Sequence, residues 1–327
     1  MKKSLLILTT LFFQFSFSQN VIVTIHFEKA IESSMITFGS SFDNDASHFV
    51  YTSNLYQIKN NSLKKNFSQK GMGLIQIVQN EDIPYTVTLP CKDGDEINLD
   101  IKTVNDKPTI IFSGTNSAGI DLLNNTPDFF RLYRSIGLIL NTKTTSIEIL
   151  DKIDNLDQGT TQQLDKLLND TKISKSFYDF TKLYLQTEII TWSYANLRVF
   201  LETTKETPNL VLLKKEEIQK TIQGLDAKYN VFDEKYKNIK TDNQYHNILN
   251  KCFFIEEKIL PQQKNYSTAF QSETLKNLIY VPKDLQEFLI YNEIIKKGGF
   301  DLDLYKMYKD KMPKGTYLSI LEQKYPK

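Results

Sequence analysis

The chain has 327 residues, and its 40 Lys and Arg side chains are balanced by 39 Asp and Glu. This neutrality argues against a nucleic-acid partner and against electrostatic binding to a membrane surface, because both need a surplus of basic side chains. The length gives ample material for a core and suggests two domains.

The N-terminus has the pattern of a cleavable signal peptide. Lys2-Lys3 forms a short basic region, residues 4–17 are apolar or small, and Ser16-Phe17-Ser18 offers the small residues that a signal peptidase accepts. The apolar run contains Gln14 and is shorter than the roughly 20 residues of a transmembrane helix, and no later segment is apolar enough to span a bilayer. We therefore expect residues 1–18 to be removed and the protein to be periplasmic, cell-envelope or secreted.

Residues 19–114 have the pattern of a small antiparallel β-sandwich or open barrel. Apolar and polar residues alternate with period two, as in 85–89 and 97–101, and Asn, Gly and Pro separate the runs. Short strands at such spacing are typical of sandwiches and barrels. The predicted strands are 21–27, 35–38, 48–51, 55–58, 74–78, 85–89, 97–101 and 109–112.

From residue 115 the apolar residues recur three or four apart, which predicts an all-α domain over 115–327. The clearest helix runs from Ser174 to about Glu202. The other predicted helices are 117–140, 144–156, 160–171, 209–222, 226–238, 242–260, 267–278, 283–297, 301–311 and 315–324. The predicted class is therefore α+β, a small antiparallel sandwich followed by a mostly helical domain.

Cys91 and Cys252 are the two cysteines. Their spacing excludes a Cys-x-x-Cys redox motif and a four-ligand zinc site. Cys91 precedes the turn Lys92-Asp93-Gly94-Asp95 and is expected near the surface, whereas Cys252 lies on an apolar helical stripe and is expected in a core. In an exported chain the two could form a disulfide that joins the domains, and two independent thiols are the alternative.

Few residues suggest catalysis or metal binding. His26 alternates with Ile25 and Phe27, so it should point away from their face, and His48 and His246 are also expected at the surface. Asp43-Asn44-Asp45 lacks the Gly and Glu that a calcium loop requires further along. We therefore predict no catalytic set, no metal site and no cofactor.

Residues 85–99 and 111–118 resemble the N-terminal β-domain of exported thioredoxin-like proteins of the Bacteroidetes kind. In both, a Gly-Asp turn leads into a strand, and a Phe-x-Gly step, here from Phe112, leads into the first helix. Residues 294–305, 312–318 and 324–325 are similar to the last helices before the catalytic domain of those proteins. The resemblance covers the mature chain in outline and implies the accessory region of a thiol–disulfide oxidoreductase.

The resemblance carries over no redox residue. In those relatives a thioredoxin domain with a Trp-Cys-x-x-Cys active site follows, whereas this sequence ends at Lys327. The single tryptophan, Trp192, has no cysteine near it in the sequence. The family's activity is therefore not implied for the residues given.

Our first hypothesis is an exported, non-catalytic binding or assembly module with a protein or small-molecule partner in the cell envelope. The crease between the sandwich and the helices is the expected binding place, because ligand pockets favour domain interfaces. One alternative is a truncated thiol–disulfide oxidoreductase that has lost its catalytic domain. Another is a hydrolase whose site combines scattered carboxylates with His26 or His48.

Overall fold

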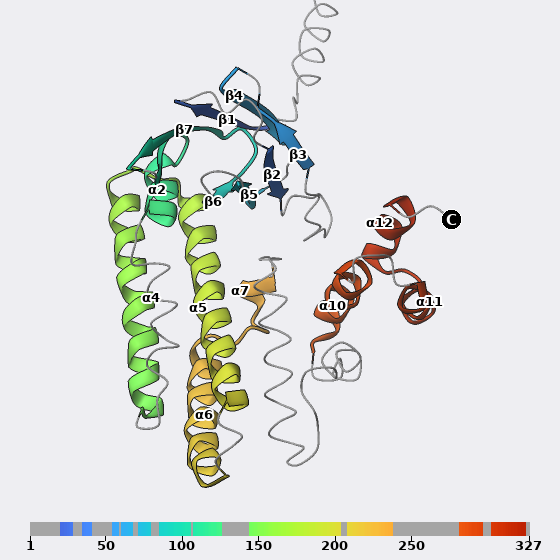
Figure 1. Ribbon diagram of the computed structural model, residues 1–327. Coiled ribbons are helices and arrows are strands. Elements are labelled where there is room, and N and C mark those ends of the chain that lie inside the picture. The colour runs from blue at the N-terminus through green and yellow to red at the C-terminus, as the bar shows by residue number, and fades with distance from the viewer. Residues whose placement is uncertain are drawn as a thin grey trace, which may run out of the picture.

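A computed structural model describes residues 20–28, 35–40, 54–58, 60–67, 71–79, 85–105, 107–125, 144–203, 208–237, 281–296 and 302–324. In these residues strands come first and helices follow, which confirms the predicted α+β class (Figure 1). The predicted signal peptide 1–18 lies outside the described residues, as do the predicted strand 48–51 and the predicted helices 242–260 and 267–278.

Two four-stranded sheets form the sandwich. The first sheet has the order β4 (Ser62–Phe67), β1 (Val21–Phe27), β7 (Glu96–Val104), β8 (Lys107–Gly114). The second has the order β3 (Asn54–Gln57), β2 (Met35–Ser40), β5 (Gly73–Gln79), β6 (Tyr85–Cys91). Alternate residues of the central strands are buried between the sheets, such as Val23 and Ile25 of β1 and Ile75 and Ile77 of β5, which accounts for the period-two pattern.

The first sheet is mixed, which corrects the expectation of a wholly antiparallel sandwich. β1 and β7 run parallel, with Ile22 opposite Glu96, whereas every other described pair is antiparallel. Two adjacent parallel strands must be joined by a long connection. Here the connection between β1 and β7 contains five strands: β4 belongs to the first sheet, and β2, β3, β5 and β6 belong to the second.

Two strand predictions were wrong in detail. β4 was not predicted, because Leu63 and Phe67 are its only apolar residues and two lysines separate them. Such a composition is typical of an edge strand, and β4 is an edge of its sheet. β2 continues to Ser40, two residues beyond the predicted end of the strand 35–38.

The described helices are α2 (Ser117–Asn125), α4 (Ser146–Asn169), α5 (Lys175–Thr203), α6 (Pro208–Lys228), α7 (Glu234–Lys237), α10 (Lys283–Lys296), α11 (Leu302–Lys311) and α12 (Thr316–Lys324). α2 lies against β6 and β8, and α4 packs on both α5 and α6 (Figure 1). None of these helices combines the length and apolar character that crossing a bilayer requires.

α4 is one continuous helix, which corrects the predicted break between 156 and 160. It begins at a capping box in which the Thr145 hydroxyl accepts from the Glu148 N–H and the Glu148 carboxylate accepts from the Thr145 N–H. The predicted helices 144–156 and 160–171 leave residues 157–159 between them. Asp157 is nevertheless buried, because its carboxylate binds groups from other helices, as described below.

Candidate functional site

Two consecutive asparagines close the boundary between the sandwich and the helices. The Asn124 side chain accepts from the Thr88 N–H and donates to the Thr88 carbonyl, with 2.8 Å between donor and acceptor in each bond. Asn125 Nδ2 donates to the Ile110 carbonyl at 2.9 Å. Thr88 lies in β6 and Ile110 in β8, the edge strands on one side of the two sheets. The C-terminal end of α2 therefore seals this side of the sandwich.

Prolines complete the seal. Since Thr88 directs its N–H and carbonyl away from β5, Pro90, two residues on, has the same orientation and no N–H to offer. In β8, the Ile110 carbonyl likewise points away from β7, and Pro108, two residues earlier, has the same orientation and no N–H. These two edges thus present few free donors to another strand.

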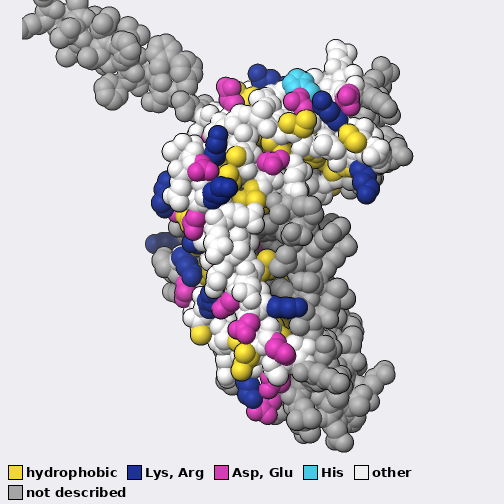
Figure 2. Space-filling model, turned by 90° about the vertical axis from the view of Figure 1, so that its left-hand side faces the viewer, with side chains coloured by type: hydrophobic (Ala, Val, Ile, Leu, Met, Phe, Trp, Pro, Cys, Tyr) yellow, Lys and Arg dark blue, Asp and Glu magenta, His cyan; other side chains and the backbone are white. Residues whose placement is uncertain are grey.

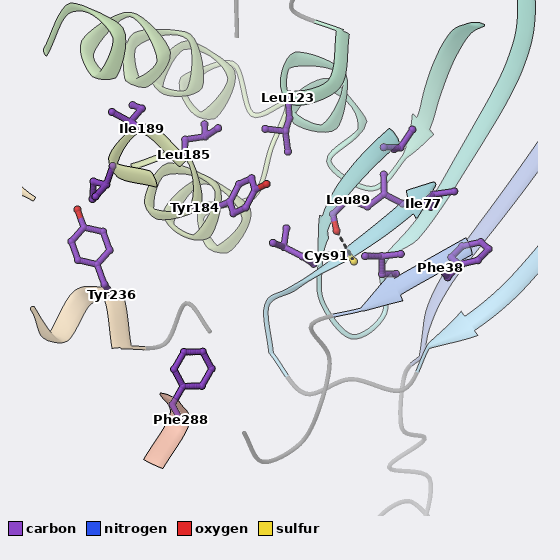
Figure 3. Packing of buried hydrophobic residues seen from close by; sticks show 14 of the residues in the cluster. Phe38, Ile77, Leu89, Cys91, Leu123, Tyr184, Leu185, Ile189, Tyr236 and Phe288 are labelled. Carbon is purple, nitrogen blue, oxygen red and sulfur yellow. Dashed lines mark hydrogen bonds between the residues drawn. The ribbon is translucent and has the colours of Figure 1, made fainter. Parts of the chain in front are cut away.

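The predicted binding crease is a packed boundary in the described residues. A Cβ on Gly119 of α2 would come within 2.3 Å of Phe177 Cε1 in α5, so α2 and α5 are in close contact. Figure 3 shows Leu123 and Tyr184 on the helical side facing Cys91 and Leu89 on the sandwich side. At the rim Lys92 Nζ donates to Ser176 Oγ at 3.0 Å. Apolar side chains therefore fill this part of the interface.

Cys91 belongs to that core, which corrects its predicted place near the surface. It is fully buried, and its thiol donates to the Leu89 carbonyl at 3.3 Å (Figure 3). Burial raises the pKa of the Cys91 thiol well above its usual value, and the charge of Asp95 raises it further. Such a thiol is a poor nucleophile. Cys252 lies outside the described residues, so the bridge between the two cysteines stays a prediction.

A group of linked polar side chains lies among the described helices, around the buried Asp157 of α4. The Tyr229 hydroxyl donates to Asp157 Oδ2 at 2.8 Å, and Gln186 Nε2 of α5 donates to Oδ1 at 3.3 Å. The Tyr236 hydroxyl of α7 donates to Gln186 Oε1 at 3.1 Å, and Lys228 Nζ lies 3.9 Å from Oδ2. One carboxylate therefore links α4 to α5, to the end of α6 and, through Gln186, to α7.

Tyrosine–carboxylate pairs recur at other helix contacts. The Tyr194 hydroxyl of α5 donates to Asp226 of α6 at 2.9 Å. In the C-terminal helices the Tyr308 hydroxyl donates to Glu287, whose same oxygen also accepts from the Tyr317 N–H. Each pair joins two elements that are distant in the sequence.

The electrostatics of these pairs favour a structural role. Burial raises the pKa of Tyr229 and Tyr194 well above the usual phenol value, and the neighbouring Asp157 and Asp226 raise it further. The pKa of Tyr308 is raised by burial and by Glu287. The phenols therefore stay protonated and donate to the carboxylates, which stabilises the helix contacts and leaves no phenolate to act as a base.

His26 is exposed on the outer face of the first sheet, as its alternation with buried Ile25 and Phe27 predicted. Its register partners are Ser62 of β4 and Asp100 of β7, so serine, histidine and aspartate form a cross-strand row. In the part of the chain that the structure describes, no hydrogen bond joins these side chains. The row therefore lacks the nucleophile–base contact of a hydrolytic triad.

The other residues that the sequence singled out cannot be placed beside those above. His48, His246 and Asp43-Asn44-Asp45 lie outside the described residues. Among the residues that are described, no three His, Cys, Asp or Glu side chains are grouped as a metal site would require. Basic and acidic side chains are interspersed over the described surface on the face shown in Figure 2.

Sequence reasoning missed the asparagine seal and the Asp157 cluster. Asp157 and Tyr229 are 72 residues apart, and nothing in the local pattern of either indicates the contact. The asparagine pair at the end of α2 was the one visible signal, because Asn side chains commonly bind free backbone groups near helix ends and turns.

No protein-family model matches the chain, and no curated protein sequence is significantly similar to it.

Proposed function

We propose that the chain is an exported, non-catalytic module that binds or assembles with a protein of the cell envelope. The observation that supports this proposal most directly is that the partly or fully buried carboxylates form hydrogen bonds between structural elements. Asp157, Asp226 and Glu287 accept hydrogen bonds from tyrosines of other elements, and those tyrosines have raised pKa values. Groups engaged in this way stabilise a scaffold, whereas a catalytic acid or base must exchange protons near the working pH.

The chemistry of Cys91 supports the same proposal. A thiol that is fully buried and has a raised pKa is inert toward disulfide exchange in the folded state. An accessory region resembling that of thioredoxin-like reductases would need no reactive thiol of its own. The signal-peptide pattern of residues 1–18 supports the export part of the proposal.

The partner surface lies away from the crease between the domains. Apolar contacts around Gly119 and Cys91 fill that boundary, and Asn124 and Asn125 close the adjacent sheet edges. Among the described residues, exposed positions away from this boundary include Ile147 on α4 and Lys64 on β4.

Site-specific photo-crosslinking in the cells that produce the protein tests this function. A photoreactive residue would replace Ile147, which is 69% exposed on α4, or Lys64, which is exposed on β4. We expect discrete adducts of one envelope protein from at least one position, and none from the buried control position Ile153.

Two assays would contradict the proposal. Turnover of a disulfide substrate such as insulin by the purified chain would favour the oxidoreductase alternative. Hydrolysis of ester or peptide substrates that is abolished by His26→Ala would favour the hydrolase alternative.

A further inference from the structure

We propose that the edge of β4 that no other described strand pairs with is a docking site for an extended, acidic segment of the partner protein, which adds to the first sheet as a further strand. This inference rests on the binding function proposed above, and names the surface and the chemistry of the partner.

The hydrogen bonds of β1 define which groups of β4 are free. Ile22 and Glu28 donate to Asp95 and Ile101 on the β7 side, whereas Phe27 donates to Asn61 on the β4 side. Odd-numbered residues of β1 thus bond to β4, and their register partners in β4 are odd-numbered as well. The even-numbered residues Ser62, Lys64 and Asn66 direct their N–H and carbonyl groups away from the sheet.

This edge lacks the seal found on the other side of the sandwich. β6 and β8 carry prolines at free positions and bind the side chains of Asn124 and Asn125. β4 has no proline, and in the described residues it pairs only with β1. Lys64 and Asn66 are exposed. A strand edge with alternate N–H and carbonyl groups available is the geometry that peptide-binding sheets use.

The charge of the surrounding sequence indicates an acidic partner. Residues 46–80 contain no Asp or Glu and four lysines, although the whole chain has nearly equal numbers of basic and acidic residues, 40 and 39. Two of them, Lys64 and Lys65, lie in β4. Lys65 Nζ is held 3.6 Å from the centre of the Tyr56 ring on β3, which places positive charge between the two edges. The acidic Asp100 is on β7, separated from β4 by β1.

A bound strand would therefore gain main-chain hydrogen bonds and charge contacts together. Side chains of the added strand alternate between the two faces of the sheet. Carboxylates on alternate residues fall on the face of Lys64 and can pair with its ammonium group. The positive charge of Lys64 would also repel a basic strand at this edge, so the site would favour acidic partners over basic ones.

Lys64→Pro is the sharpest test of the main-chain contact. Since the Lys64 N–H points away from β1, proline removes a free donor without removing a bond of the β1–β4 ladder. Lys64→Arg keeps both the donor and the charge and is the matched control. The probe is a short fluorescent peptide in which valine alternates with glutamate, and its binding is measured by fluorescence anisotropy.

We expect the peptide to bind the wild type and the Arg variant equally, and the Pro variant about tenfold more weakly. A peptide with glutamine in place of glutamate should bind more weakly, and salt should reduce the difference. Absence of binding to the wild type, or equal binding to the Pro variant, would overturn the edge proposal.

Lys64→Glu decides the question if the Pro variant does not fold. It keeps the backbone donor and reverses the charge, so the glutamate peptide should bind about tenfold more weakly and a lysine peptide more tightly. Unchanged peptide preference would overturn the proposal. Crosslinks from position 147 but not from position 64 would contradict the edge site and leave the proposed binding function intact.

Discussion

The side-chain amide of Asn124 pairs with the backbone of Thr88 as a neighbouring strand would, through two hydrogen bonds of 2.8 Å each. A carboxamide carries the same donor and acceptor as a peptide group, so it can occupy the place of a missing strand. The last turn of α2 is therefore part of the hydrogen bonding of the second sheet. This contact fixes the first described helix to the sandwich.

Asn124→Ala should lower the free energy of unfolding by about 2–3 kcal/mol. Thr88 is 9% exposed, so its N–H and carbonyl would lose their partners in a place that water scarcely reaches. Urea denaturation at neutral pH measures the change. Asp121→Ala is the control, because it removes an exposed contact to Asn125 and should change stability by less than about 0.5 kcal/mol. Equal effects of both variants would contradict the role assigned to Asn124.

Stability should fall as the pH rises above about 10, the usual phenol pKa. The pKa values of Tyr194 and Tyr229 are raised by burial and by their carboxylate partners. Above pH 10 the unfolded chain therefore releases phenol protons that the folded chain retains. Each such tyrosine lowers the free energy of unfolding by up to about 1.4 kcal/mol per pH unit. Below the unfolded value this contribution is fully present.

Tyr229→Phe checks this dependence. At neutral pH the variant should be about 1 kcal/mol less stable, because Asp157 loses a hydrogen bond. Between pH 10 and pH 11 its stability should decline less steeply than that of the wild type. Parallel curves would mean that Tyr229 ionises equally in both states.

Two helical glycines should respond to alanine in opposite directions. In α2, a Cβ at Gly119 would meet Phe177 Cε1 at 2.3 Å, so Gly119→Ala should destabilise by about 1–3 kcal/mol. In α4, a Cβ at Gly159 would have no heavy atom within 4 Å, so Gly159→Ala should stabilise by about 0.5–1 kcal/mol. Thermal and urea denaturation of the two variants measure both effects. A loss of stability in Gly159→Ala would show that α4 is not a continuous helix there.

Cys91 should react with a thiol reagent only when the protein unfolds. The experiment uses Cys252→Ser, so that one thiol is monitored. Because the thiol is fully buried and its pKa is raised, native protein should react orders of magnitude more slowly than protein in denaturant. Rapid reaction of the folded variant would show that the boundary around Cys91 opens readily.

The wild-type protein decides whether Cys91 and Cys252 are bridged. Thiols are counted in denaturant with and without prior reduction. A bridge predicts that reduction raises the count, and two independent thiols predict equal counts.

The period-two pattern of the sequence was sufficient to predict most of the sandwich. Val21–Phe27 alternates between buried and more exposed positions as predicted, and His26 lies on the outer face. β4 could not be predicted in this way, because an edge strand needs few buried residues and Lys64 and Lys65 interrupt the pattern. The parallel pairing of β1 with β7 joins residues more than 70 positions apart, and the local sequence of neither strand indicates its partner.

The helical domain shows where local signals mislead. Residues 157–159 were predicted to separate two helices, but Asp157 is held by Tyr229, and this tertiary contact outweighs the modest helix-propensity cost of Gly159. The turn after Cys91 suggested a surface position, yet the strand end is covered where the sandwich meets the helices. Contacts between residues distant in the sequence decided both outcomes.

The parallel pairing of β1 with β7 constrains the order in which the chain can fold. β1 is the first described strand, and it occupies the second position of its sheet, between β4 and β7. Its even-numbered backbone groups have no partner until Glu96 and the residues after it are available. During synthesis from the N-terminus, the β7 side of Val21–Phe27 therefore stays unpaired until β2 to β6 have been synthesised. We therefore expect the sandwich to fold more slowly than a sheet built only from neighbouring hairpins, because pairing β1 with β7 requires the closure of a long loop.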